Sequence, residues 1–249
     1  MTSPAVEVTD LVKVYRSTRA VDGISFSVPR GAVVGLLGGN GAGKTTTIGM
    51  IMGLVSPDGG RIRVLGRDMP RERYAVLERM NFESPYADMP HRLTVRENLT
   101  VFGRLYAVSA LPRRIDELVA AFDLGSFVDR KAGQLSAGQK TRVALAKALI
   151  NSPDVLLLDE PTASLDPDTA DWVRSRLEAY RAETGAAILL ASHNMPEVER
   201  LCDTVVIMRA GRIVDRGPPA ELVARYGRTN LEEVFLDVAR GRARSEEPA

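Results

Sequence analysis

The stretch "GLLGGNGAGKTTT", residues 35–47, decides the fold. Gly38 is followed, after four residues, by Gly43, Lys44 and Thr45, which is the P-loop pattern. Glycines let backbone N–H groups wrap a phosphate, a lysine reaches the β- and γ-phosphates, and a threonine hydroxyl can ligate magnesium. An apolar run precedes the stretch and a helical pattern follows it. The stretch therefore predicts a nucleoside triphosphate site, and the alternative is a glycine-rich turn.

An acidic pair ends a second apolar run, "DVLLLDE". Asp159 and Glu160 follow this predicted strand, and ligands of open α/β sheets sit beyond the carboxyl ends of strands. Asp159 can hold magnesium, and Glu160 can accept the proton of an attacking water. The alternative is a solvated strand end without a role.

The order of the predicted elements indicates a parallel sheet. Residues 5–36 alternate short β-like runs with turns, and "DGGRIRVLG" predicts a turn and a strand. Residues 94–150 are mostly helical in pattern, as in "RRIDELVAAFDL". Three apolar strand-like runs follow, "DVLLLDE", "AAILLAS" and "TVVIMRAG", with a helical stretch between the first two. Apolar strands that alternate with helices favour a sheet covered on both faces.

Composition argues against several classes of protein, among them disulfide-bonded, secreted and membrane-spanning proteins. Of the 249 residues, 45% are hydrophobic and 26% charged, as in ordinary globular proteins. The formal net charge of +1 gives no basic field that would point to nucleic acid. The single cysteine, Cys202, permits no internal disulfide and is expected to be an apolar filler. The first residues lack a secretory signal pattern, and the apolar runs are far shorter than the ~20 residues that span a membrane.

A second anion site is predicted at "QLSAGQKTRVALAKALI", residues 134–150. Ser136 is a good N-cap, and the first N–H groups of a helix carry the positive end of its dipole. An ordinary capped helix is the alternative. Lys140, Arg142 and Lys147 are read as the solvated face of this helix. Trp172 is expected to pack against a neighbouring element.

These motifs occur in a familiar order: the P-loop, "LSAGQ", "LLLDEPTASLD" and "ASHN". The chain resembles the ATP-binding cassette (ABC) family, the ATPase subunits of membrane transporters, over about residues 4–238. The resemblance implies an α/β fold with a P-loop NTPase (RecA-like) core, an antiparallel β-subdomain and an inserted α-helical subdomain at about 85–150. The ATPase domain is expected over 1–225, and a helical extension with a mobile tail over 226–249.

The resemblance also implies why one chain carries two phosphate sites. In this family two subunits pair head to tail, and each "LSGGQ"-type motif closes over the ATP held by the other subunit's P-loop. The matching residues here are Leu135, Ser136, Ala137, Gly138 and Gln139. Ala137 stands where a glycine is usual. ATP would then join the two subunits, because it binds the dimer better than the separated chains.

Further roles carry over from the resemblance one residue at a time. Tyr15 matches the aromatic that stacks on adenine, although an aromatic before a strand is more often part of a core. His193 matches the histidine that contacts the γ-phosphate, and Lys44 and Glu160 complete the catalytic set. Asp166 matches the loop that crosses the subunit interface, and it can also be an N-cap. The expected nucleotide-binding residues are Tyr15, Gly38, Gly39, Asn40, Gly41, Ala42, Gly43, Lys44, Thr45, Thr46, Ser136, Gly138, Gln139 and Asp166, and Thr45 and Asp159 are the expected magnesium ligands.

One segment departs from the family pattern. Alignment to "LTVRENL" places Pro85 where a glutamine usually links magnesium and water to the transporter partner. Proline has no polar side-chain group, so Glu83 and Ser84 are the nearest polar candidates. The favoured alternative is that this loop only docks, with Phe82, Tyr86 and Met89 facing the membrane partner.

The predicted function is ATP hydrolysis, with magnesium, that powers transport through separate multi-span permease subunits. The ending "TNLEEVFLDVARG" resembles the export branch. The resemblance further implies a peripheral subunit on the cytoplasmic side of the cell membrane, paired with a second ATPase subunit in what is expected to be a homodimer. Two rival classes are a soluble cassette ATPase acting on DNA or ribosomes, and a regulatory module that holds ATP without turnover. The sequence does not name the transported substrate.

Overall fold

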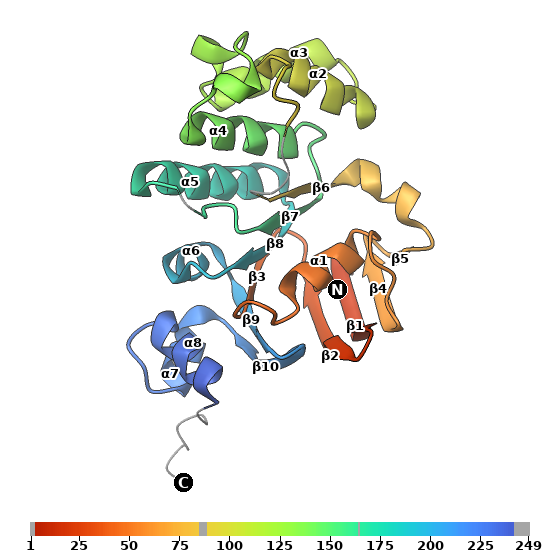
Figure 1. Cartoon of the computed structure of the whole chain (residues 1–249), viewed down its shortest axis with the longest axis vertical. Coiled ribbons are helices and arrows are strands. Elements are labelled where there is room, and N and C mark those ends of the chain that lie inside the picture. Colours follow the sequence, from red (N-terminus) through yellow and green to blue (C-terminus); the bar gives the residue numbers. More distant parts are fainter. Residues whose placement is uncertain (1–2, 85–88, 164, 242–249) are drawn as a thin grey trace.

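The computed structural model of the protein describes residues 3–84, 89–163 and 165–241. Two β-sheets meet near the middle of the molecule, and helices cover them and extend to both ends (Figure 1). None of the helices in the described ranges combines the length and the apolar character that a membrane crossing requires.

The first sheet is antiparallel and four-stranded, in the order β2-β1-β4-β5. Its strands are β1 (Val6–Tyr15), β2 (Thr18–Val28), β4 (Gly59–Val64) and β5 (Arg67–Met69). In β1 the side chains of Val6 and Val8 are buried while Glu7 and Thr9 are exposed. This alternation is typical of a sheet with one covered face.

The second sheet has six strands in the order β10-β9-β3-β8-β7-β6. Its strands are β3 (Val33–Leu37), β6 (Met80–Glu83), β7 (Val155–Asp159), β8 (Ala187–Ser192), β9 (Thr204–Arg209) and β10 (Arg212–Gly217). Five strands are parallel, and β10 pairs antiparallel with β9. Every residue of β3, β7 and β8 is buried, as the continuous apolar runs predict for a sheet covered on both faces.

Helices cover the second sheet on both faces. The helices are α1 (Lys44–Ile51), α2 (Val95–Leu105), α3 (Leu111–Ala121), α4 (Ala137–Ala148), α5 (Pro167–Thr184), α6 (Met195–Leu201), α7 (Pro219–Arg225) and α8 (Leu231–Arg240). Short 3₁₀ turns are η1 (Arg73–Ala75), η2 (Leu77–Arg79), η3 (Gly125–Phe127) and η4 (Ala132–Gln134). Leu158 and Leu190 belong to the core shared with α2–α8, whereas Leu157 and Leu189 belong to the core shared with α1 and the first sheet. The strand period of two thus divides the apolar side chains between two cores.

Helices α2, α3 and α4 form a helical arm, residues 89–150, at the end of the molecule far from α7 and α8 (Figure 1). The chain leaves the sheet after β6 and returns to it at β7, which is the parallel neighbour of β6. Because α4 carries Ser136 as its N-cap, the arm is what places the "LSAGQ" motif. The arm falls within the predicted helical insertion.

Most predicted strands are confirmed, but β5, β6 and β10 lie outside the predicted runs. After residue 225, Tyr226, Leu231 and Val238 are buried in the same core as the six-stranded sheet, so α8 packs onto the main body. Of the predicted tail, "ARGRARSEEPA" (residues 239–249), the first two residues belong to α8, and residues 242–249 lie outside the described residues.

Candidate nucleotide site

The loop between β3 and α1 is shaped by close packing within the chain. Gly43 has a φ of 105°, and a Cβ there would lie 2.5 Å from the carbonyl oxygen of Ala20 in β2. A Cβ on Gly38 would lie 2.7 Å from the carbonyl oxygen of Met208 in β9. Backbone oxygens cannot swing aside as side chains do, so these two positions require glycine. Two strands therefore fix the course of the P-loop.

The first residues of α1 bring cationic and hydroxyl groups to this loop. Lys44 is buried, and its Nζ donates a hydrogen bond to the Gly38 carbonyl at 2.6 Å. Thr45 Oγ1 donates to Asp159 Oδ2 at 2.9 Å, which joins the P-loop to the end of β7. Burial raises the pKa of Asp159, and the Thr45 hydrogen bond opposes this rise. A cation beside Asp159 would favour its charged form.

Glu160 and His193 form a second pair at the same end of the sheet. Glu160 follows β7 with a φ of 57°, a conformation that is uncommon for residues other than glycine. Its backbone N–H donates to the Ala191 carbonyl at 2.8 Å. His193, which follows β8, lies with Nδ1 2.7 Å from Glu160 Oε2 and also donates its backbone N–H to that oxygen. The pair holds the Glu160 side chain in one orientation and leaves the histidine ring largely exposed.

Lys44, Thr45, Asp159 and Glu160 line one open pocket of about 550 Å³. The pocket is lined by residues 39–46, residues 18–20 of β2, the acidic pair and Ala210. This volume suits a nucleotide-sized ligand. Tyr15 is not among the lining residues, but it pairs with Thr18 in the β1–β2 hairpin and is 47% exposed. The sequence did not single out the contribution of residues 18–20, which no motif marks.

The "LSAGQ" motif lies at the start of α4 and does not line this pocket. Ser136 is the N-cap, as predicted, and forms a capping box with Gln139. The Gln139 N–H donates to Ser136 Oγ at 3.3 Å, and the Ser136 N–H donates to Gln139 Oε1 at 3.1 Å. Ser136 is nevertheless exposed, so its hydroxyl hydrogen can still be donated to a ligand.

Asp166 is the N-cap of α5, as the sequence also allows. Its carboxylate accepts from the Thr169 N–H at 3.0 Å and from Thr169 Oγ1 at 2.7 Å. These bonds keep the pKa of Asp166 below its usual range. A Cβ on Gly138 would lie 3.3 Å from Thr169 Oγ1, so the signature helix packs directly on the first turn of α5.

Two of the three basic residues of α4, Arg142 and Lys147, do not belong to the solvated face that the sequence suggested, whereas Lys140 is partly exposed. Lys147 is buried, because its side chain turns toward β6 rather than outward. The Arg142 guanidinium lies 4.6 Å from the centroid of the Trp172 ring and forms an ion pair with Asp123. Trp172 packs edge-on against Phe122, as its predicted packing role implies.

The loop that departs from the family pattern is described only at its edges. Pro85 and Tyr86 lie outside the described residues. Glu83 and Ser84 are both buried, and Glu83 forms an ion pair with Lys147. Met89 does not face outward as expected, because it is buried in the core that the six-stranded sheet shares with α2–α8. Phe82 is half-buried against the other core.

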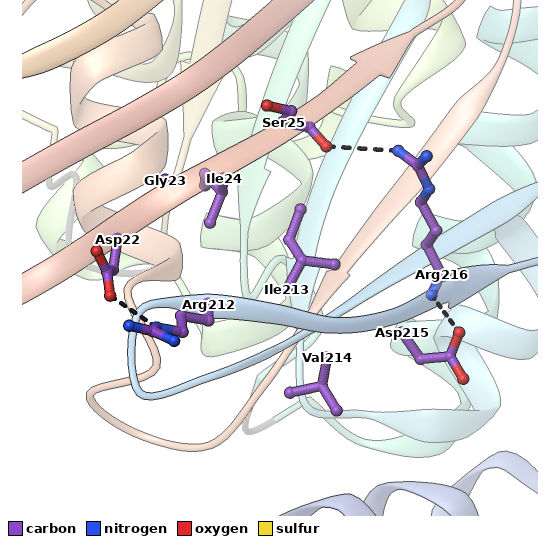
Figure 2. A pocket seen from close by; sticks show the side chains of 9 residues that line it. All are labelled: Asp22, Gly23, Ile24, Ser25, Arg212, Ile213, Val214, Asp215 and Arg216. Atoms are coloured by element: carbon purple, nitrogen blue, oxygen red, sulfur yellow. Dashed lines mark hydrogen bonds and ion pairs between the residues drawn. The ribbon is translucent and has the colours of Figure 1, made fainter.

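A second open hollow, of about 510 Å³, lies between β2 and β10 (Figure 2). Both strands are outer strands of their sheets. Arg212 Nε donates to Asp22 Oδ2 at 2.6 Å, and Arg216 donates to the Ser25 carbonyl at 3.4 Å, so contacts within the chain bridge the hollow. It contains none of the residues predicted to bind nucleotide, and it is best described as the joint between the two sheets.

Comparisons with known proteins agree with the geometry. A family model described as ABC transporter matches residues 21–163. The chain is 40% identical over 237 residues to the Nod factor export ATP-binding protein I of Paraburkholderia xenovorans (strain LB400), which covers 94% of this chain and 78% of that protein. It is 39% identical over 244 residues to the daunorubicin/doxorubicin resistance ATP-binding protein DrrA of Streptomyces peucetius, with 97% and 73% covered. A solved ATP-binding subunit of an ABC transporter matches with a TM-score of 0.86 at 29% identity, covering 94% of this chain and 99% of that one.

The chain therefore belongs to the ABC transporter family. It is an ATP-binding and ATP-hydrolysing subunit that powers transport through separate membrane-spanning subunits, and it is similar to exporter-type subunits. Its P-loop NTPase fold is confirmed.

Proposed function

We propose that two copies of this chain pair head to tail and enclose two ATP molecules between them. The observation that supports this pairing is the separation of the two anion-binding elements within one chain. Residues 39–46 line the pocket, whereas the start of α4 does not, although it is exposed and carries the features of an anion site. A second copy would bring its own α4 over the pocket and complete it.

ATP binding is assigned to the P-loop half of the site. Backbone N–H groups of residues 38–46 wrap the phosphates, and Lys44 adds its charge from the first turn of α1. Tyr15, exposed at the end of the hairpin that borders the pocket, stacks on the adenine ring.

Thr45 and Asp159 are the residues that would hold magnesium. Their oxygens are adjacent at the pocket, one a hydroxyl and one a carboxylate. This donor set fits magnesium, which takes one or two protein oxygens and completes its shell with phosphates and water. When bound, the ion supplies positive charge that stabilises the transferring phosphoryl group.

Glu160 is assigned as the base that receives the proton of the attacking water. His193 fixes the Oε2 atom of Glu160 through two contacts, which leaves Oε1 to face the water. A base held in one orientation needs no further ordering when water attacks. Contacts with the γ-phosphate are assigned to the exposed His193 ring and the Lys44 ammonium.

The signature half is assigned to the partner's ATP. Ser136 donates its hydroxyl hydrogen to the γ-phosphate, and the first N–H groups of α4 add the positive end of the helix dipole. Gly138 allows the approach, and Gln139 holds Ser136 in place through the capping box. Asp166, which packs beside Gly138 through Thr169, lies at the interface between the two chains.

The direction of transport is proposed to be export, as in the two relatives whose names state export or drug resistance. The subunit is proposed to bind its permease from the cytoplasmic side, as a peripheral component. Co-purification of a multi-span membrane protein with the tagged chain would test this assignment, and co-purification of ribosomes in its place would contradict it.

Mixed dimers test the shared sites directly. Ser136→Arg blocks the signature and Lys44→Ala removes the P-loop charge, so each variant alone should lose turnover. Two chains with different tags allow the mixed dimer to be isolated. If the sites are shared, the mixed dimer keeps one intact site, made of the P-loop of the Ser136→Arg chain and the signature of the Lys44→Ala chain, and it hydrolyses ATP.

The matched control places both changes in one chain and pairs it with the wild-type chain. Shared sites make this dimer inactive, because each site then contains one changed half. Sites confined to one chain give the opposite pattern, with activity in the control and none in the first mixture. That opposite pattern would refute the head-to-tail arrangement.

A further inference from the structure

A buried ion pair joins the helical arm to the six-stranded sheet. Glu83 is the last residue of β6, and Lys147 lies in the last turn of α4. Lys147 Nζ lies 2.9 Å from Glu83 Oε2, and the two side chains are 8% and 9% exposed. The same Nζ lies 5.3 Å from the ring centroid of Phe102 in α2. Both charges give up hydration when they are buried, so the pair is a poor source of stability.

Polar contacts beside this pair also connect the helical arm to the six-stranded sheet. Asn81 precedes Glu83 by two residues and therefore lies on the same face of β6. Asn81 Nδ2 donates to Asn151 Oδ1 at 2.8 Å, just beyond the end of α4. The Tyr106 hydroxyl, at the end of α2, donates to Asn81 Oδ1 at 3.1 Å. One face of one short strand thus makes directional contacts with two helices of the arm.

Directional contacts restrict the arm in a way that apolar packing does not. Apolar side chains tolerate small rotations, because other apolar contacts replace those that are lost. A buried charge that loses its partner has no such replacement, and removal of one partner is strongly destabilising. Replacement of both partners by apolar residues is often harmless to stability. A buried pair therefore selects one geometry, and here that geometry is the setting of α4 against β6.

The position of the pair makes this setting relevant to ATP. Glu83 pairs with Leu158 in the sheet, directly before Asp159. Lys147 and Ser136 lie at opposite ends of α4, about 16 Å apart at 1.5 Å per residue. A helix is stiff over this length, so a rotation at Lys147 displaces Ser136 relative to the sheet that holds the proposed catalytic residues.

We propose that Glu83 and Lys147 are positioning residues that set the angle at which α4 presents Ser136 to the ATP on the partner subunit. The inference rests on the proposed function and adds to it a contact within the chain that controls the second half of the site. It also implies that Glu83 does not replace the missing glutamine, since its carboxylate is engaged by Lys147 and buried.

The test compares single and double replacements in the full chain. The host is the Glu160→Gln chain, in which bound ATP is not consumed, and the readouts are ATP-driven dimerisation by sedimentation, ATP affinity of the monomer, and thermal unfolding. Lys147→Met alone should lower the unfolding temperature. Adding Glu83→Leu should restore it, because no unpaired charge then remains. The double variant should bind ATP as the host does but dimerise about tenfold more weakly, because α4 is no longer held in its setting.

Trp172, the only tryptophan in the sequence, reports on the setting of α4 without ATP. It lies in α5, and its ring contacts Phe122 of the arm and Arg142 of α4. The double variant should therefore change the tryptophan emission while its unfolding temperature matches that of the host. Arg96→Met is the matched control, because it removes a cation from an exposed ion pair of the same arm. It should change neither emission nor dimerisation.

Two results would overturn the inference. One is a double variant of host stability that dimerises as tightly as the host with unchanged emission. The other applies if that variant does not fold: Lys147→Arg, which keeps both charges but changes the geometry of the pair, would then dimerise as the host does. If the host itself fails to dimerise on adding ATP, the proposed function fails, and the inference with it.

Discussion

The P-loop and the start of α4 both offer backbone N–H groups to phosphate, but their surroundings differ. A Cβ added at Gly38 or at Gly43 would lie within 3 Å of a neighbouring backbone oxygen, and Lys44 is buried beneath the loop. Ser136, in contrast, is exposed, and its capping partner Gln139 comes from its own first turn. The P-loop is therefore shaped by tertiary packing, whereas the N-terminus of the signature helix is capped by residues of its own first turn.

The difference teaches how the two halves can share one ligand. A loop fixed by two strands can bind ATP before any partner arrives. A helix end whose polar groups are hydrogen-bonded by its own capping residues can stay exposed in the free subunit. It can then move onto the partner's ATP as a unit. Changes in the first half should affect stability and ATP affinity together, and changes in the second half should affect association alone.

The largest effect is expected for Glu160→Gln. Loss of the base should reduce ATP turnover by about 10²–10⁴-fold while ATP binding is kept. Because bound ATP then persists between the two halves, the variant should form a stable dimer when ATP is added. Steady-state hydrolysis and light scattering measure both effects. Turnover at the wild-type rate would remove Glu160 from the mechanism.

A pair of glycine replacements tests the contrast between the halves. Gly43→Ala introduces a Cβ 2.5 Å from a backbone oxygen at a positive φ, and should lower the free energy of unfolding by more than about 2 kcal/mol. Gly138→Ala meets only the Thr169 side chain at 3.3 Å in a helix, where alanine is favoured, and should change it by less than about 0.5 kcal/mol. Urea unfolding measures both. Equal losses in the two variants would mean that the halves are built alike.

A smaller effect is expected for Tyr15, which belongs to the P-loop half but is exposed like the signature. Tyr15→Ala should weaken ATP binding by about fivefold, near the lower end of the range for base–aromatic stacking. Tyr15→Phe keeps the ring and serves as the control. The free energy of unfolding should not change in either variant, since the ring is half exposed. Titration with a fluorescent ATP analogue measures the affinity, and equal binding by all three chains would exclude stacking.

The parts of the fold that depend on local chemistry could be predicted from the sequence. Strands β3, β7 and β8 are continuous apolar runs, and buried parallel strands require such runs. The N-caps at Ser136 and Asp166 depend on residue types that bond their own helix. The P-loop glycines occupy positions where the pattern requires them.

Features that depend on distant partners could not be predicted. Strand β6 contains Asn81 and Glu83, which break its apolar pattern because they bond α2 and α4. The sequence around Lys147 indicates an exposed residue, but the side chain is buried because it forms an ion pair with Glu83. Met89 lies before α2, where no helical period marks it, and it is buried in the core that the six-stranded sheet shares with the helices. In each case a partner far along the chain decides the environment.

Cys202 gives this molecule a practical property. The thiol lies under β3, where a Cβ on Gly35 would approach its sulfur to 2.8 Å, and burial raises its pKa well above its usual range. Since the thiolate is the reactive form, maleimide and similar reagents should not modify Cys202 in the native protein. A cysteine introduced at an exposed site such as Arg104 of the arm can then be labelled selectively without first replacing the native one. In this way a dye or a spin label can be attached to a chain that is otherwise unaltered.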